Sequence, residues 1–82
     1  GPFAGGIQGN VTQGGAPVAA TVTVNGLPGG VSTDPSGNYN LNDIPVGSQT
    51  VRATLVSDPL VFQEQSITVI AGVTTTVNFM FP

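Results

Sequence analysis

The chain has 82 residues with one basic and four acidic side chains, so its formal net charge is −3 and only 6% of its positions are charged. A chain of this length is long enough for one domain and too short for two. It contains no His, no Cys and no Lys, and its sole basic side chain is Arg52. These counts exclude disulfides and metal sites built on Cys or His, and we expect no cofactor.

The same counts remove most kinds of function. A serine nucleophile needs a neighbouring base, and the four carboxylates stand in no catalytic spacing. One arginine on a net-negative chain cannot neutralise a phosphate backbone, so we expect no nucleic-acid partner. The apolar runs are far shorter than the about 20 residues that span a bilayer. The sequence therefore predicts a protein that is not an enzyme and has no membrane span.

The amino-terminal segment, residues 1–6, is too rich in glycine to hold a strand alone. We expect a flexible or partner-bound tail there, followed by a single β-sandwich domain over residues 7–82. The chain begins at Gly1 and not at Met, which indicates processing or excision from something longer, and Gly1-Pro2 can be a protease scar.

Segments of strand length follow the tail, separated by turn signals rich in Gly, Pro, Asp and Asn. Apolar residues alternate with Thr and Asn, which is typical of half-buried strands. The expected strands cover residues 7–12, 18–25, 31–33, 38–41, 49–56, 61–70 and 73–81. The last two are joined at Ala71-Gly72, a connection short enough for a hairpin. Seven strands without a helix predict an all-β fold, a seven-stranded antiparallel β-sandwich.

Two of the turn signals have specific chemistry. Asp34 precedes a proline and suits the first position of a type I turn, while Gly37 takes a backbone conformation that other residues resist. A calcium loop is the functional alternative for Asp34, but the nearby oxygen donors are amides, which favours the turn. Pro45 and Gly47 mark a second turn.

The order of these motifs resembles the carboxypeptidase regulatory-like domains. The resemblance covers roughly residues 7–81 and is carried by Ile7-Gln8-Gly9-Asn10-Val11, Ala20-Thr21-Val22-Thr23-Val24, Thr33-Asp34, Gly37-Asn38-Tyr39 and Ile44-Pro45-Val46-Gly47. It implies an Ig-like sandwich similar to transthyretin and Cna-B repeats, found in secreted and surface proteins as a stabilising or spacing module, sometimes adhesive or glycan-contacting. It brings no catalytic residues.

One feature of the Cna-B relatives is missing here. They often carry an isopeptide crosslink between Lys and Asn, and this chain has no Lys, so that bond cannot form. Tyr39 is interpreted as a core aromatic whose hydroxyl reaches a backbone partner, with sugar stacking as the alternative.

Alternation along the last two expected strands sorts their side chains into two faces. If Ile67 and Val69 lie in the core, then Phe62 and Ile70 face outward. On the final strand the same alternation places Met80 outside and the following residues inside: Val73, Val77, Phe79 and Phe81.

A candidate protein–protein interface therefore consists of Phe3, Phe62, Ile70 and Met80. The alternatives are that single exposed apolar residues are normal, or that a β-bulge near Val61 reverses the facing.

The expected sheet edges carry no Lys to guard them. We therefore expect edge-to-edge pairing, or addition of residues 2–6 as a strand to the open edge of a neighbouring copy. A head-to-tail contact of this kind does not close, so it would build a filament.

Asn10-Val11-Thr12 matches the acceptor pattern for N-linked glycosylation, which makes Asn10 the candidate site; the alternative is an ordinary solvent-facing strand residue.

The function that the sequence favours is a non-enzymatic, extracellular or cell-surface structural module, either a spacer or a filament subunit. Its expected partners are copies of itself or neighbouring domains of a surface protein. The alternatives are a carbohydrate-binding or adhesive module, with glycans as partners, and an accessory domain of a secreted peptidase. Carbohydrate-binding modules usually present exposed aromatic residues, and this chain has one Tyr, four Phe and no Trp.

Overall fold

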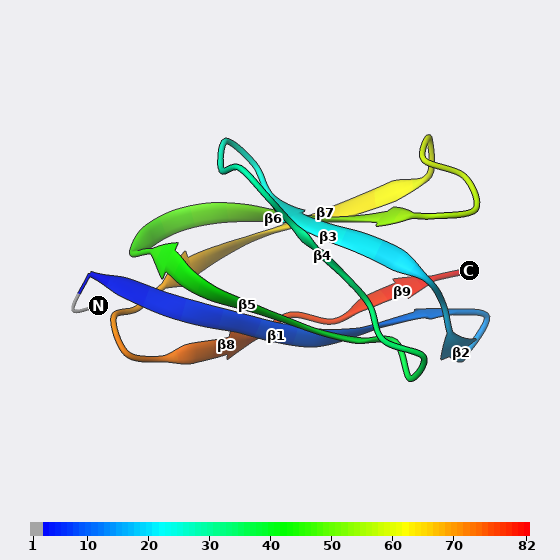
Figure 1. Cartoon of the computed structure of the whole chain (residues 1–82), viewed down its shortest axis with the longest axis horizontal. Helices are drawn as coiled ribbons and strands as arrows, with labels where there is room; N and C mark the ends of the chain where they lie inside the picture. The colour runs from blue at the N-terminus through cyan, green and yellow to red at the C-terminus, as the bar shows by residue number, and fades with distance from the viewer. Residues whose placement is uncertain (1–2) are drawn as a thin grey trace.

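Alternating apolar and polar residues build nine strands in a computed structural model that describes residues 3–82, and this part of the chain contains no helix (Figure 1). The strands are β1 (Ala4–Gln13), β2 (Ala16–Pro17), β3 (Ala20–Val24), β4 (Val31–Ser32), β5 (Asn38–Pro45), β6 (Gly47–Leu55), β7 (Phe62–Val69), β8 (Thr74–Thr76) and β9 (Phe79–Phe81). They form two facing sheets in a molecule that measures 37 × 22 × 18 Å. The predicted all-β sandwich is confirmed.

The first sheet is organised around β1, which has partners on both sides. It pairs antiparallel with β5 and β2, and parallel with β8 and β9. The second sheet has the order β4-β3-β6-β7, with antiparallel pairing throughout. The chain enters β1 at one end of the long axis and leaves β9 at the other (Figure 1).

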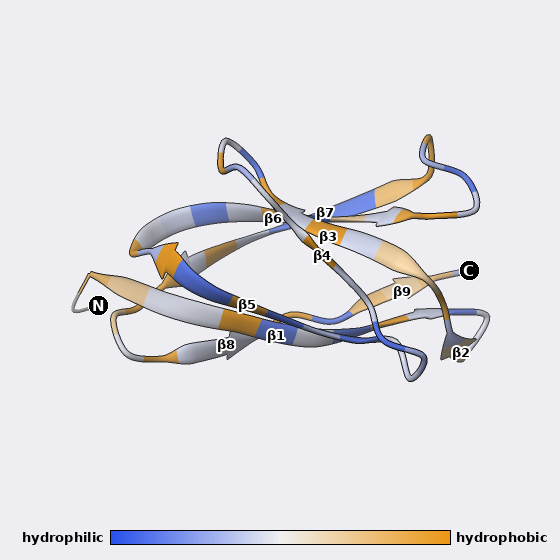
Figure 2. Cartoon of the chain, viewed as in Figure 1, coloured by the Kyte–Doolittle hydropathy of each residue, from blue (hydrophilic) through white to orange (hydrophobic). Residues whose placement is uncertain are grey.

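The core lies between the two sheets and is entirely apolar apart from one tyrosine hydroxyl. Figure 2 shows apolar and more polar positions alternating along β3, whose alternate residues Ala20, Val22 and Val24 are buried. The buried residues of this core are Ile7, Val11, Ala20, Val22, Val24, Tyr39, Leu41, Ile44, Val51, Ala53, Leu55, Val69, Val77, Phe79 and Phe81.

Two expectations about strand number and direction are corrected. The structure has nine strands and not seven, because Ala16–Pro17 forms a short extra strand and the expected strand over 73–81 is divided into β8 and β9. The first sheet is mixed and not antiparallel, because β1 runs parallel to β8 and β9.

The expected hairpin at Ala71-Gly72 is also wrong. The turn is tight, with the Val73 amide donating to the Ile70 carbonyl at 3.1 Å. However, β7 belongs to the second sheet and β8 to the first, so the turn crosses between sheets. Val73 lies in this crossover and is 44% exposed, and not inside as alternation predicts.

The boundary of the expected tail is wrong as well. Ala4 to Gly6 begin β1 and pair with β5 and β8, while residues 1–2 lie outside the described residues. A side chain at Gly5 would collide with the carbonyl oxygens of Ile70 and Val73, so this glycine permits close packing and does not mark a flexible segment. Because Ala4 to Gly6 are already paired within their own chain, they are not free to add to a neighbour's edge.

A β-bulge interrupts the pairing of β1 with β5. Gly5 pairs with Ile44 and Ile7 pairs with Leu41, so β5 contains one extra residue in this interval. Asp43 lies in this interval and has a φ of 58°, in the left-handed region, which accommodates the extra residue. As a result Leu41 and Ile44 both face the core, although simple alternation would place them on opposite faces.

Candidate functional site

All large apolar side chains that are exposed within residues 3–82 lie at the two ends of the sandwich. The amino-end cluster consists of Phe3, Val46, Ile70 and Val73. The carboxyl-end cluster consists of Val56, Leu60, Val61, Phe62 and Met80. β1 begins and β9 ends at the same two ends (Figure 1).

Backbone hydrogen bonds hold the amino-end cluster together. The Val46 amide donates to the Phe3 carbonyl at 3.1 Å, which ties the β5–β6 turn to the start of the chain. The Gly72 amide donates to the Ala4 carbonyl at 3.0 Å, which adds the β7–β8 turn. Three separate segments therefore present their apolar side chains on one surface, and Phe3 is 79% exposed there.

The carboxyl-end cluster is built on the loop between β6 and β7. The Leu55 amide donates to the Val61 carbonyl at 3.0 Å, and the Leu60 amide donates to the Asp58 carboxylate at 3.2 Å. Leu60 at the tip is 89% exposed. The loop thus has a fixed shape while its largest apolar side chain stays in solvent, which is an unfavourable arrangement unless another surface covers it.

The four predicted interface residues do not form one patch. Phe3 and Ile70 belong to the amino-end cluster, whereas Phe62 and Met80 belong to the carboxyl-end cluster, with Phe62 46% and Met80 77% exposed. Alternation along the strands did not identify Val46 and Leu60. The signal that could have found them is their place beside turn residues, since turns lie at the ends of a sandwich.

An ion pair lies next to the carboxyl-end cluster, the single one in residues 3–82. Arg52 Nη2 lies 2.8 Å from Glu64 Oε2, and its guanidinium carbon lies 4.1 Å from the centre of the Phe62 ring. Hydrogen bonds from Asn25 and Arg52, together with the positive charge, lower the pKa of Glu64. The contacts among Arg52, Glu64 and Phe62 orient the Phe62 ring. They involve Arg52, the sole basic side chain of the chain.

Tyr39 packs where β1 has a glycine. On β5 it lies directly opposite Gly9, and a Cβ at Gly9 would be 2.9 Å from the Tyr39 ring and would overlap the Val77 carbonyl oxygen. That carbonyl accepts a hydrogen bond from the Tyr39 hydroxyl. Burial raises the pKa of Tyr39 to about 12. Tyr39 therefore has the core position and backbone partner predicted for it, and offers no stacking surface to a sugar.

Asn10 is the centre of a small amide network on the outer face of the first sheet. Its side-chain nitrogen donates to the Ser36 carbonyl at 3.0 Å and to Asn38 Oδ1 at 2.8 Å. Its backbone amide donates to Asn78 Oδ1 at 2.9 Å. Both hydrogens of the nitrogen that would carry a glycan are thus in use, so glycosylation of Asn10 costs the folded chain at least one of these bonds.

Asp34 and Gly37 lie in a turn that connects β4 to β5. The Asp34 carboxylate accepts the backbone amides of Ser36 and Asn38, both at 2.9 Å, and the Gly37 amide donates to the Asp34 carbonyl at 2.9 Å. Gly37 has a φ of 82°. No group of three or more metal-ligating side chains exists in residues 3–82.

Pro45 and Gly47 flank the tight turn between β5 and β6. Pro45 ends β5 and accepts a hydrogen bond from the Gln49 side chain at 3.0 Å, while Gly47 begins β6 with a φ of 107°. This geometry projects Val46 outward at the amino end.

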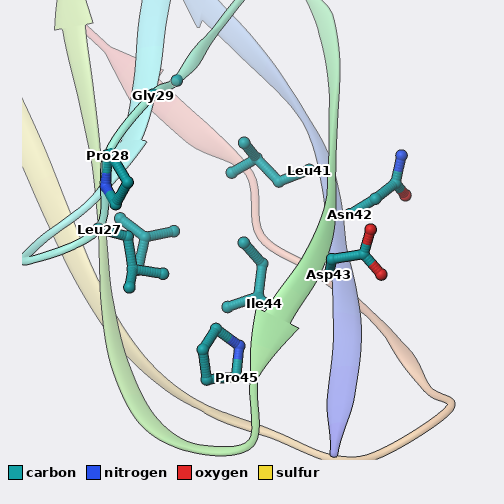
Figure 3. Close-up of a pocket in the computed structure, with 10 residues that line it drawn as sticks. Leu27, Pro28, Gly29, Leu41, Asn42, Asp43, Ile44 and Pro45 are labelled. Atoms are coloured by element: carbon teal, nitrogen blue, oxygen red, sulfur yellow. The ribbon is translucent and has the colours of Figure 1, made fainter. Parts of the chain in front are cut away.

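A groove of about 280 Å³ runs between the β3–β4 loop and β5. Figure 3 shows that Leu27, Pro28 and Ile44 line it, whereas the polar ends of Asn42 and Asp43 point away from Leu27. Its volume falls below the about 300–1,000 Å³ of typical small-molecule sites. The groove therefore has neither the size nor the convergent polar groups of a ligand pocket.

The two facing sheets and the apolar core between them place the chain in a class of protein, the β-sandwich modules. Residues 6–82 match the carboxypeptidase regulatory-like domain family, and the chain belongs to it. Residues 3–82 contain no helix that is long and apolar enough to cross a membrane.

Among solved structures, the chain is similar to "The Bacillus anthracis TIE protein", with a TM-score of 0.68 and 19% sequence identity. The similarity covers 95% of this chain but 16% of that one, so the shared unit is one part of a much longer protein. At this identity the likeness shows the fold alone. No curated protein sequence matches the chain.

Proposed function

We propose that the chain is a structural module of an extracellular or cell-surface protein and that it acts end to end. Neighbours contact it at its two ends, either as adjacent domains of a longer chain or as further copies in a filament. The observation that carries this proposal is the placement of every large exposed apolar side chain of residues 3–82 at the ends where the chain enters and leaves.

One lateral edge of the sandwich, formed by β7 and β9, is poorly suited to pairing with an added strand. On the edge formed by β7 and β9, the Gln63 side chain donates to the Met80 carbonyl at 2.9 Å, and the Gln65 side chain donates to the Asn78 carbonyl. These bonds occupy backbone acceptors that an added strand would need. We therefore place self-association at the end clusters and not at the edge formed by β7 and β9.

An extracellular or surface location is supported by the family and by the composition, which is poor in charge and rich in Thr, Asn, Gln and Ser. Protease treatment of intact source cells tests it: an external module is digested or shed, whereas an internal one survives until the cells are opened.

Carbohydrate binding remains the alternative with less support. Tyr39, Phe79 and Phe81 are buried, and the two exposed aromatic residues, Phe3 and Phe62, lie at opposite ends. The described residues thus offer no aromatic platform for a sugar ring. Binding to a glycan array would favour this alternative.

A complementation experiment tests end-to-end association. In a head-to-tail contact the amino-end cluster of one copy meets the carboxyl-end cluster of the next, so Phe3→Ser and Leu60→Ser each block elongation. Sedimentation of each variant alone should show monomers, and an equimolar mixture should form dimers through the two intact ends. Thr21→Ala, on the exposed outer face of the second sheet, is the control and should associate like the parent chain.

Two results would contradict this proposal. One is association that persists in both end variants, because it would then arise from the sides of the sandwich. The other is a two-copy tandem chain that X-ray scattering shows folded side by side, since a spacer or filament subunit must extend along its axis.

A further inference from the structure

The first and last strands of the domain lie side by side and run in the same direction. β1 pairs parallel with β8 from Gly6 opposite Thr74 and with β9 as far as Gln13 opposite Phe81. The chain enters before β1 at one end and leaves after β9 at the other (Figure 1). A load on the two termini therefore pulls β1 and β9 in opposite directions along their length, and the hydrogen bonds between them are sheared together and not opened one by one.

Hydrogen bonds join these strands over most of the length of β1. The Gly6 amide donates to the Val73 carbonyl at 3.0 Å near one end, and the Gly14 amide donates to the Phe81 carbonyl at 3.0 Å beyond the other. In the middle, the Val77 amide donates to the Gln8 carbonyl at 2.8 Å.

Asn78 closes the gap between β8 and β9. The Val77 carbonyl accepts a hydrogen bond from the Tyr39 hydroxyl and therefore none from β1. The backbone pairing of β1 with β8 and β9 is interrupted at this point. The Asn78 side chain takes over as acceptor of the Asn10 amide at 2.9 Å. The register is unchanged across the gap, since Gln8 lies opposite Thr76 and Val11 opposite Phe79.

The Tyr39 ring adds a steric obstacle to sliding. It occupies the space that Gly9 leaves free, and Ile7 and Val11 lie two residues to either side on the same buried face. Both side chains are fully buried. If β1 moves lengthwise by two residues, the side chain of Ile7 or of Val11 has to pass the Tyr39 ring. This movement requires the core to open.

We propose that the domain bears tensile load through a shear clamp, formed by β1 with β8 and β9 and latched by Tyr39 in the space above Gly9. The use of the clamp rests on the proposed function, because load reaches it only if neighbours hold both ends. The resistance itself is a property of the single domain. It relies on hydrogen bonds and packing, since the chain has no Lys for an isopeptide crosslink.

Forced unfolding of single molecules in two pulling geometries tests the clamp. In the first, handles at residues 3 and 82 apply load along the strands. In the second, handles at residues 57 and 82 apply it at one end of the sandwich, where β9 peels from β1 one bond at a time. The absence of native Cys allows Ser57→Cys to direct the second handle. We expect a higher unfolding force in the first geometry, and equal forces would overturn the proposal.

A pair of variants separates the clamp from general stability. Asn78→Ala removes the side-chain acceptor between β1 and β9, and under load along the strands we expect unfolding to be about tenfold faster. Thr33→Val is the control: its hydroxyl donates to the Val18 carbonyl at 3.1 Å and accepts the Ala20 amide at 3.0 Å, and neither bond joins β1 to β8 or β9.

Thr33→Val should lower the unfolding temperature without changing the rate under load. If it accelerates forced unfolding as much as Asn78→Ala does, or if Asn78→Ala changes nothing, the clamp is refuted. These measurements use isolated molecules, so their result does not depend on whether copies associate end to end. The shear clamp and end-to-end association can therefore be refuted independently of each other.

Discussion

Gly9 lies at the crowded centre of the first sheet, where the Tyr39 ring and the Val77 carbonyl occupy the space of a side chain. Three features therefore meet at this residue: the position of Tyr39, the inward turn of the Val77 carbonyl and the interruption between β8 and β9. Glycine is required at this site because of close approach, since its φ is not in the left-handed region.

We predict that Gly9→Ala destabilises the fold severely, by about 3 kcal/mol or more, because the new methyl group overlaps backbone that cannot move aside. Gly14→Ala is the matched control. Gly14 has a φ of 60°, and a Cβ added there would have no neighbouring atom within 4 Å, so only conformational strain of about 1 kcal/mol is expected. Urea unfolding of both variants measures the difference, and equal losses would contradict the role of close packing at Gly9.

Tyr39 gives the protein a stability limit at alkaline pH. Its pKa is raised from 10 to about 12 in the folded chain, so below pH 10 the hydroxyl is protonated in both states and stability is complete. Between pH 10 and 12 the unfolded chain releases its proton while the folded chain retains it, and the free energy of unfolding falls by roughly 2 to 3 kcal/mol.

The phenolate absorbance measures this directly, because Tyr39 is the sole tyrosine. We expect a titration midpoint about two pH units higher in the native protein than in denaturant. Tyr39→Phe should abolish the alkaline decline and lower stability at neutral pH by about 1 to 3 kcal/mol, because the Val77 carbonyl loses its donor. A native midpoint near 10 would show that the hydroxyl is not buried as described.

At the scale of elements, the irregular positions in the strands determine which side chains reach the core. The bulge at Asp43 brings Leu41 and Ile44 to the same face. The interruption at Val77 and Asn78 keeps β1 in register with β8 and β9 while freeing one carbonyl for Tyr39. Neither irregularity follows from a strict alternation of residues.

The bulge predicts a specific sensitivity at Asp43. Asp43→Val places a β-branched side chain at a φ of 58° and should cost about 1 to 2 kcal/mol. Asp43→Asn keeps a side chain that tolerates the left-handed region and should lose less unfolding free energy than Asp43→Val. Denaturant unfolding of both variants provides the comparison, and a Val variant as stable as the Asn variant would show that the bulge does not constrain this residue.

At the scale of the whole molecule, stability depends on apolar packing and hydrogen bonding, with little contribution from charge. The one ion pair in residues 3–82, Arg52 with Glu64, has side chains 39% and 34% exposed, and such pairs contribute little. The chain has no His, so no side chain with an ordinary pKa near neutrality changes its charge there.

We therefore predict that the free energy of unfolding changes by less than about 0.5 kcal/mol between pH 6 and 9, and by a similarly small amount between low and high NaCl. Below pH 5 a small loss is expected, because the pKa of Glu64 is lowered in the folded state and protonation there opposes folding. Thermal unfolding across this range provides the measurement. A large salt dependence would indicate that charged contacts outside Arg52 and Glu64 hold the fold.

Alternation, turn residues and motif order were sufficient to predict the all-β sandwich and the family. Alternation also placed Phe62, Ile70 and Met80 on the outside. However, the predicted interface grouped residues that lie at opposite ends of the molecule. The glycine content of residues 4–6 indicated a tail where the structure has a strand. The error has a physical cause: glycine in a flexible segment and glycine in a crowded strand look the same until the neighbouring backbone is known.

By itself, the sequence determined what is local. Residue alternation decides which face of each strand is apolar, Gly and Pro decide where turns occur, and the lack of His, Cys and Lys removes most catalytic and covalent chemistry. Only the tertiary structure decided which strands are neighbours. The parallel pairing of β1 with β8 and β9, and the gathering of apolar residues at two ends, join positions up to about 70 residues apart. Such contacts depend on how the whole chain closes around one core, and no local pattern records them.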